Sequence, residues 1–420
     1  MEHRGARGQR RDAQRVGEHP RVAQRPEDTG RDQQAHARDL SSPALRQTVV
    51  HAPGAEALRA LFGTPAPLTI GVEDELMLLD PDTLDLVPRA SEVLAACAGD
   101  PRFKLELPAS QLEILLPPLG GADAAAAALA DARALLAARA APLARPAALA
   151  LHPFAATEGV LNTGERHARI ERRYGAVARR QLLCALQLHV AVRGAGRALA
   201  VHDALRGHLP ALTALTAAAP FHGGRDTGHE SWRPRVADLL PRHGIPPALG
   251  SWEAYAAALR PLPEPGQWWW DVRPHPLYGT LEVRVPDAQA SVEEAEAVIA
   301  VVHALVAWLA ERHDRGEPLP VPATAPLAAD RAAAARDGLA AELTDPDTGE
   351  RATARERLAA LFDELAPVAA RLGGERGLAR AREIVAEGGI PARHRAIAAE
   401  GGLRALVADV AGRFAPADRG

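Results

Sequence analysis

Four short segments of the chain alternate apolar and polar residues with a period of two, the pattern of a β-strand that has one buried face. In the first segment, residues 68–79, the apolar side chains share one face with Asp74, whereas Glu73 and Glu75 fall together on the other face. Two carboxylates about 7 Å apart on one face of a buried strand repel each other and resist desolvation. The pattern therefore predicts a positive partner between them, and a divalent metal ion is the simplest such partner.

The other three segments repeat this arrangement, each with two polar side chains on one face and aliphatic side chains on the other. The polar pairs are Gln111 with Glu113 in residues 104–115, Gln187 with His189 in residues 183–192, and Glu282 with Arg284 in residues 280–285. A single pair of this kind is typical of a solvated outer strand. Four pairs with metal- and phosphate-binding chemistry indicate instead the floor of an active site.

Longer segments between and after these strands have helical composition. They are residues 55–61, 122–150, 170–181, 198–218 and 291–313, and most of the chain beyond residue 321, with breaks at 345–349, 373–374 and 388–389. The turn signal at residues 81–83 predicts that residues 84–87 return as the second strand of a hairpin. The predicted fold class is α+β, with a curved antiparallel sheet, helices on its outer face and a helical C-terminal section.

The first 48 residues differ in composition from the rest. They are rich in Arg, Gln, Asp and Glu and contain almost no large apolar side chains. Such a segment cannot bury enough surface to fold, so we expect residues 1–48 to form a disordered N-terminal tail. A basic arm for a partner is the alternative, but acidic residues are interspersed throughout. One catalytic domain is expected over residues 66–415.

Overall charge limits the possible partners of the protein, and the cysteines indicate its redox compartment. The 420 residues carry a formal net charge of −4, which gives no global basic field for nucleic acid or an anionic membrane. No apolar run reaches the roughly 20 residues of a membrane span, and no signal peptide follows Met1. Cys97 and Cys184 lie in apolar segments, as buried free thiols of a reducing compartment do. We expect a cytoplasmic protein that acts on small molecules, and a homo-oligomer is compatible with the sequence.

Lysine usage limits how a nucleotide could be bound. Lys104 is the only lysine, so the chain has no Gly-x-x-x-x-Gly-Lys phosphate loop. Arginines and metal ions must then neutralise any nucleotide phosphates.

Several motifs occur in an order that resembles the type 2 glutamate–cysteine ligases. They lie at residues 71–75, 110–114, 152–154, 179–182, 224–228, 270–274 and 280–284. The resemblance runs from about residue 68 to about residue 414. It implies a glutamine synthetase-like fold and an ATP-dependent carboxylate–amine ligase, with glutamate and cysteine as nominal substrates, ATP as cofactor, and Mg²⁺, or alternatively Mn²⁺, as metal ion.

The resemblance assigns metal ligands to the polar strand faces that the alternation selects. The ligands are Glu73, Glu75, Glu113, His189 and Glu282. Carboxylate oxygens are the ligands that Mg²⁺ prefers, often shared with substrate phosphates. Arg284 lies on the face of Glu282 and would contact the transferred phosphoryl group, so these two residues are the catalytic candidates. A salt bridge from Arg284 to a neighbouring glutamate is the alternative for that side chain.

The remaining candidates bind the nucleotide or the amino acid. Arg336 joins Arg284 as a cofactor-binding residue by resemblance. The glycine-rich segment 223–228 lines the substrate pocket in the family, which makes Arg225, Thr227 and the following Arg233 substrate-binding candidates. Gln111 would orient a metal-bound water or a substrate group.

The chain departs from the family pattern at three places. Asp74 replaces a glutamate but faces away from the polar row, Gln187 replaces a frequent histidine, and residues 329–338 lack the usual aromatic and polar side chains. The amine and carboxylate substrates therefore stay open. The alternatives are a ligase for another amino acid and amine, a metal-dependent hydrolase that uses the same floor to activate water, and a binding protein that has lost turnover.

Overall fold

The structure is a computed structural model. It describes residues 53–64, 67–260 and 268–415. Every described residue belongs to one compact unit, which lies within residues 41–420. The predicted disordered tail lies outside the described residues, and it stays a prediction.

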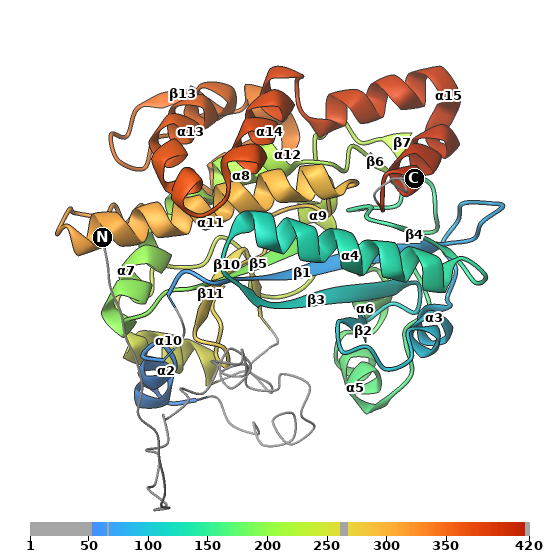
Figure 1. The fold of residues 1–420 in the computed structure, drawn as a ribbon, viewed down its shortest axis with the longest axis horizontal. Coiled ribbons are helices and arrows are strands. Elements are labelled where there is room, and N and C mark those ends of the chain that lie inside the picture. The colour runs from blue at the N-terminus through green and yellow to red at the C-terminus, as the bar shows by residue number, and fades with distance from the viewer. Residues whose placement is uncertain (1–52, 65–66, 261–267, 416–420) are drawn as a thin grey trace, which may run out of the picture. The chain divides into compact units, whose positions relative to one another are not determined.

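An antiparallel sheet forms the centre of this unit (Figure 1). Its strand order is β10-β11-β5-β1-β3-β2, and β4 pairs with the end of β1. The strands are β1 (Ile70–Leu79), β2 (Phe103–Leu105), β3 (Gln111–Leu119), β4 (Arg145–Ala147), β5 (Leu186–Ala191), β10 (Val272–Pro274) and β11 (Thr280–Val283). All four predicted strand segments thus contribute to one sheet, which confirms the predicted α+β class.

Helices cover one face of the sheet. The helices α4 (Ala122–Ala140) and α11 (Val292–Asp314) pack on the strands, and α13 (Ala354–Arg371) and α14 (Glu375–Ala386) pack on α11 (Figure 1). The others are α2 (Ala55–Leu61), α3 (Ala90–Ala96), α5 (Glu165–Tyr174), α6 (Ala176–Arg179), α7 (Ala195–Leu205), α8 (Leu209–Thr216), α9 (Arg233–Ala237), α10 (Trp252–Leu259), α12 (Thr324–Asp337) and α15 (Ile390–Gly412). Small two-stranded sheets pair β6 (Phe221–His222) with β7 (Arg225–Asp226), β8 (His243–Gly244) with β9 (Trp269–Trp270), and β12 (Glu342–Thr344) with β13 (Arg351–Thr353).

The face assignment predicted for β1 is correct. Asp74 lies among the aliphatic side chains on the helical side, where both carboxylate oxygens accept hydrogen bonds from Arg133 of α4 at 2.8 and 3.0 Å. Both side chains have no exposed surface. Arg133 also donates to the backbone carbonyls of Gln289, Ala290 and Phe414. This guanidinium therefore links the central strand, the segment before α11 and the residues that follow α15.

Two predicted elements are wrong in extent. The predicted helix 122–150 ends at Ala140, and residues 145–147 form β4 instead. Pro142 and Pro146 explain the difference, because proline lacks the backbone N–H and disfavours helical geometry in the residue before it. Residues 84–87 form only an isolated bridge from Leu86 to β1, since Leu84 has a left-handed backbone (φ 60°) that a strand cannot contain.

Three smaller differences have local causes. The segment 104–115 is two strands, because Pro108 interrupts it between β2 and β3. The predicted helix 170–181 is split into α5 and α6 at Gly175, whose φ is +57°. The C-terminal section is helical as predicted and has the predicted break at residues 345–349, but the short strands β12 and β13 on either side of this break were not predicted.

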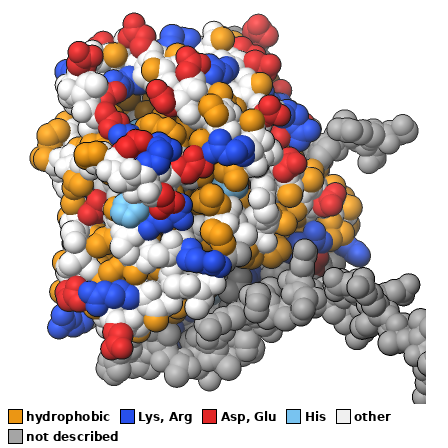
Figure 2. Space-filling view, turned by 60° about the vertical axis from the view of Figure 1, so that its left-hand side comes forward, with side chains coloured by type: hydrophobic (Ala, Val, Ile, Leu, Met, Phe, Trp, Pro, Cys, Tyr) orange, Lys and Arg blue, Asp and Glu red, His pale blue; other side chains and the backbone are white. Residues whose placement is uncertain are grey.

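The structure also bears on the predictions drawn from composition. Cys97 and Cys184 are buried free thiols, as predicted. Acidic and basic side chains are interspersed on the face shown in Figure 2, without a continuous patch of either sign. Within the described ranges, no helix combines the length and the apolar character needed to cross a membrane.

Candidate active site

The strand register brings the predicted polar pairs into one row on the sheet face opposite α4 and α11. Cross-strand partners along this row are Lys104 with Glu113, Glu113 with Glu75, Glu73 with Gln187, His189 with Glu282, and Glu282 with Arg273. Neighbouring strands lie about 4.8 Å apart, so side chains on one face of paired positions are within contact distance. The sheet thus assembles the row from segments that are far apart in the sequence.

Three members of the row form a compact cluster suited to a cation. Glu73, His189 and Glu282 each offer one ligand atom, and these atoms all lie within 4.8 Å of one another. Nε2 of His189 donates to Glu73 at 3.1 Å, and its Nδ1 lies 3.0 Å from the hydroxyl of Thr280. A second hydrogen bond of this kind fixes the ring orientation of metal-ligating histidines. Two carboxylates and one oriented imidazole are a donor set that fits Mg²⁺ or Mn²⁺.

The charges of this cluster stabilise one another. Burial disfavours the ionised form of Glu73, but the neighbouring His189 outweighs it and lowers the pKa of Glu73 to about 2. Burial likewise opposes ionisation of Glu282, but Arg273 and Arg284 hold its pKa well below the usual value. Both carboxylates are therefore anionic at neutral pH and available to a cation.

Glu75 and Glu113 face each other one step further along β1 and β3, where negative charge is in excess. Burial and the nearby Glu106 raise the pKa of Glu75 to about 8. Burial and the carboxylate of Glu73 raise the pKa of Glu113 well above its usual value. Positive charge placed here would relieve this repulsion. The predicted five ligands therefore divide into a compact group of three and a neighbouring pair.

Two arginines contact Glu282. Arg273 forms a bidentate pair with it, at 2.5 and 3.0 Å, and lies over the ring of Trp268. Nη1 of Arg284 contacts both Glu282 and the side-chain oxygen of Gln187. Arg284 thus makes the salt bridge to a neighbouring glutamate that was the alternative to a phosphoryl contact, and it remains on the polar face, partly exposed.

A buried network behind the row fixes the backbone of Arg284. Its backbone N–H donates to the carbonyl of Asp271 at 2.8 Å. The carboxylate of Asp271 pairs with Arg331 from α12, which also contacts His243 and Asp238. The helix α12 therefore positions a residue of the polar row without reaching the row itself.

Stacked rings lie beside His189. His275 and Tyr278, from the turn between β10 and β11, stack with centroids 4.0 Å apart. Both rings are within 6 Å of the His189 ring centroid, at 5.3 and 5.7 Å. They form an aromatic wall at the end of the cation cluster.

The substrate- and nucleotide-binding candidates do not form a single cluster. Gln111 is on the polar face, and its buried amide nitrogen has no hydrogen-bond partner among the described residues. Arg225 is exposed on β7, and the Thr227 hydroxyl donates to the carbonyl of Pro220. Arg233 is buried and pairs with Asp287 at 2.6 Å. The guanidinium of Arg233 also donates to the backbone carbonyls of Arg284 and Val285, so it lies behind the row. The structure does not bring Arg225 and Thr227 to the row.

Arg336 also lies apart from the row. Its guanidinium is half exposed and pairs with the adjacent Asp337. Among the tryptophans of the 268–270 run, Trp268 is fully buried in the core, whereas Trp269 makes an edge contact with Tyr174 of α5 at 5.8 Å. Core packing is therefore the role of Trp268.

Sequence reasoning does not identify Arg273, Lys104 or Arg331. A signal for Arg273 does exist: two apolar segments flank a short turn that ends at Gly279, and pairing them as a hairpin places Arg273 opposite Glu282. Lys104 similarly follows from pairing β2 with β3. No local signal points to Arg331, because its partners come from segments about 60 and 90 residues away.

Solved enzyme structures of low sequence identity share this fold. A crystal structure of glutamate–cysteine ligase from Francisella tularensis in complex with AMP has the same fold, with a TM-score of 0.63 and 13% sequence identity over 82% of this chain and 88% of that chain. A bifunctional glutathione synthetase from Pasteurella multocida aligns with a TM-score of 0.57 and 15% identity, over 86% of this chain and 53% of its own length.

The family follows from the sequence comparisons. Residues 69–409 match the model of glutamate-cysteine ligase family 2, and the chain belongs to this family. Two relatives carry the name "Putative glutamate--cysteine ligase", with suffixes 2-3 and 2. The first, from Rubrobacter xylanophilus, is 39% identical over 335 residues, 77% of this chain and 90% of the relative. The second, from Mycobacterium tuberculosis, is 32% identical over 338 residues, 78% of this chain and 89% of the relative.

Proposed function

We propose that the protein is an ATP-dependent carboxylate–amine ligase that joins the γ-carboxylate of L-glutamate to the amine of L-cysteine. The observation that carries the proposal is the cluster of Glu73, His189 and Glu282 beside Arg284, on the polar face of the sheet. The AMP in the Francisella tularensis crystal structure supports the use of ATP by this fold.

The chemistry requires charge neutralisation more than covalent help from the protein. A carboxylate oxygen is a poor leaving group, and transfer of the γ-phosphoryl group of ATP converts it into an acyl phosphate that the amine can attack. Several negative charges meet in this step, so catalysis depends on positioning and electrostatic stabilisation. When bound, Mg²⁺ or Mn²⁺ neutralises phosphate oxygens. Glu73, His189 and Glu282 would hold one such ion, and Glu75 with Glu113 would hold another.

Arg284 supplies the protein's own positive charge. A planar guanidinium can donate two parallel hydrogen bonds to a phosphoryl group. In the structure the guanidinium donates to Glu282 and Gln187, so a bound phosphate would replace these two side chains as the acceptor. Arg273 keeps Glu282 in place from the opposite side during this exchange.

Substrate contacts are proposed for Gln111, Arg225, Thr227 and Arg233. The unpartnered amide nitrogen of Gln111 can donate to a substrate carboxylate. Arg225 is exposed and free to move toward a bound amino acid, whereas the positive charge of Arg233 acts on Glu75 from within the protein. Arg336 is proposed as a nucleotide contact from the exposed end of α12.

An incubation of the full chain with Mg-ATP and single or paired amino acids tests the proposal, with ADP and phosphate followed over time. A ligase releases phosphate only when ATP, a carboxylate donor and an amine are all present. If another pair replaces glutamate and cysteine, the ligase chemistry stands and the substrate assignment changes. Turnover without ATP would identify a metal-dependent hydrolase, and nucleotide binding without turnover would identify a binding protein.

A further inference from the structure

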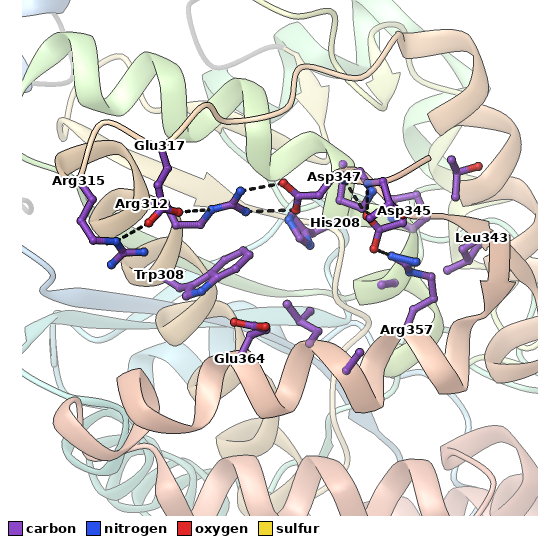
Figure 3. Close-up of a pocket in the computed structure, with 18 residues that line it drawn as sticks. His208, Trp308, Arg312, Arg315, Glu317, Leu343, Asp345, Asp347, Arg357 and Glu364 are labelled. Carbon is purple, nitrogen blue, oxygen red and sulfur yellow. Dashed lines mark hydrogen bonds and ion pairs between the residues drawn. The ribbon is translucent and has the colours of Figure 1, made fainter. Parts of the chain in front are cut away.

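A cavity of about 590 Å³ lies on the helical side of the sheet, away from the polar row (Figure 3). Its walls come from the start of α8, the C-terminal part of α11, the β12–β13 turn and α13. Pockets of about 300–1,000 Å³ are the usual size of small-molecule sites. We refer to this space as the helical cavity.

One face of α13 gives the helical cavity two opposite charges. Arg357, Ala360, Leu361 and Glu364 are spaced three, four and seven residues apart and all line it. Seven residues of an α-helix rise about 10 Å. The guanidinium and the carboxylate therefore stand about two turns apart, with apolar side chains between them. Trp308 of α11 lies across the cavity, above Glu364 in Figure 3.

Most other charges around the cavity already have partners. Arg312 pairs with Asp347 at 2.8 Å and with Glu317 at 3.2 Å, and Arg315 pairs with Glu317 at 2.5 Å. These pairs form the continuous chain drawn in Figure 3.

Glu364 is the exception. Glu364 is an exposed residue at the rim of the cavity, near Trp308, and its carboxylate makes no hydrogen bond or ion pair with any described residue. Arg357 pairs with Asp345, but a guanidinium has five N–H donors, and one such pair does not exhaust them. Burial lowers the pKa of the nearby His208 to about 4, so this ring adds no positive charge at neutral pH. The cavity therefore has unmatched negative charge at the Glu364 end.

We propose that the helical cavity binds a small zwitterionic peptide, with its ammonium at Glu364, its carboxylate at Arg357 and its body against Trp308. An extended chain spans at most about 3.3–3.6 Å per residue, so two or three residues bridge the two charges. A single amino acid is too short, because its ammonium and carboxylate are on the same carbon. The proposal concerns a second site and does not depend on the proposed ligase reaction.

Calorimetric titration of the full chain with tri-L-alanine tests the proposal. Saturable binding is expected, and Glu364→Gln should weaken it at least tenfold, because the variant lacks the charge that pairs with the ammonium. N-acetyl-trialanine lacks the ammonium and should bind the unaltered protein as weakly as trialanine binds Glu364→Gln. Trialanine amide lacks the carboxylate and should bind the unaltered protein as weakly as trialanine binds Arg357→Gln. L-alanine should not bind at this site.

Asp363→Asn is the matched control, because Asp363 is the next residue on α13 but pairs with Arg382 outside the cavity. This variant should bind the peptide normally. Glu364→Gln should melt like the unaltered protein, since Glu364 has no partner to lose among the described residues. Glu282→Gln, in the polar row, separates the two sites and should leave peptide binding unchanged.

Three outcomes would overturn the proposal. One is the absence of saturable heat up to about 10 mM peptide, well above the roughly 1 mM dissociation constant of a weak specific complex. Another is equal affinity of Glu364→Gln and the unaltered protein. The third is loss of binding in Glu282→Gln but not in Glu364→Gln, which would place the peptide on the polar row.

Discussion

The buried pair between Asp74 and Arg133 leads to a sharp prediction about stability. Asp74→Asn preserves the size of the side chain but removes the charge opposite a guanidinium that has no exposed surface. Arg133 keeps its carbonyl contacts, yet these neutral acceptors cannot replace the lost charge. Breaking a buried ion pair by removing one partner costs about 3–5 kcal/mol.

This free energy converts into a measurable change of melting temperature. Unfolding entropy is about 2.1 cal/mol/K per residue, so a domain of about 350 residues has an unfolding entropy of about 0.7 kcal/mol/K. A loss of 3–5 kcal/mol then lowers the melting temperature by about 4–7 °C. Facing away from the polar row therefore does not make Asp74 tolerant of substitution.

Differential scanning calorimetry of three variants checks this prediction. Asp74→Asn should show the full decrease. The double variant Asp74→Leu with Arg133→Met should recover only part of it. The apolar pair has no unpaired charge, but the carbonyls of Gln289, Ala290 and Phe414 lose their donor. Asp131→Asn, exposed on the same helix two residues from Arg133, should stay within about 0.5 kcal/mol of the unaltered protein. A melting temperature of Asp74→Asn within 1 °C of the unaltered protein, about the error of such a comparison, would refute the reasoning.

Four further predictions concern the polar row and the pH dependence. Glu73→Gln and Glu282→Gln should each lower turnover by orders of magnitude and raise the Mg²⁺ concentration needed for half-maximal rate, and an unchanged metal dependence would contradict their role. Arg284→Lys should keep ATP affinity but lose turnover, as measured by kcat and by calorimetric titration, because it retains the charge without the planar fork. ADP at a hundredfold excess over its dissociation constant should stabilise the fold by about 2.7 kcal/mol in thermal melts with Mg²⁺ or Mn²⁺; equal stabilisation in EDTA would argue against a metal bridge. The pKa of His208 is about 4 in the folded chain and about 6.5 when unfolded, so the unfolded state binds the proton first and stability falls as pH decreases from about 6.5 to 4. Urea titrations across this range should show a smaller decrease of the free energy of unfolding for His208→Gln than for the unaltered protein.

The polar row could be predicted from the sequence because strand alternation is a local property. A period of two assigns each side chain to a face without knowledge of the partner strand. It correctly separated Asp74 from Glu73 and Glu75, and it brought Gln187 and His189 to the same surface. The metal and substrate roles of these residues stay predictions.

Pairing between strands and packing between helices could not be predicted in the same way. Arg273 and Lys104 enter the row through hairpin register, which depends on contacts across the sheet. The segment around Arg233 has no period, and only the fold reveals that this side chain is buried against Asp287. The predicted end of the helix 122–150 was wrong for a simpler reason. Two prolines end the helix early, although the sequence before them is rich in alanine.

The two faces of β1 restrict how the length of this chain can vary. The strand pairs with β3 on one side and β5 on the other, and it carries the carboxylates of the polar row on one face and the partner of Arg133 on the other. A one-residue insertion would turn every later side chain to the opposite face. Glu75 would then enter the helical core and aliphatic side chains would enter the row, so one insertion would remove both activity and stability. Insertions and deletions should therefore be tolerated in the exposed turn at residues 80–83 and excluded from residues 73–79.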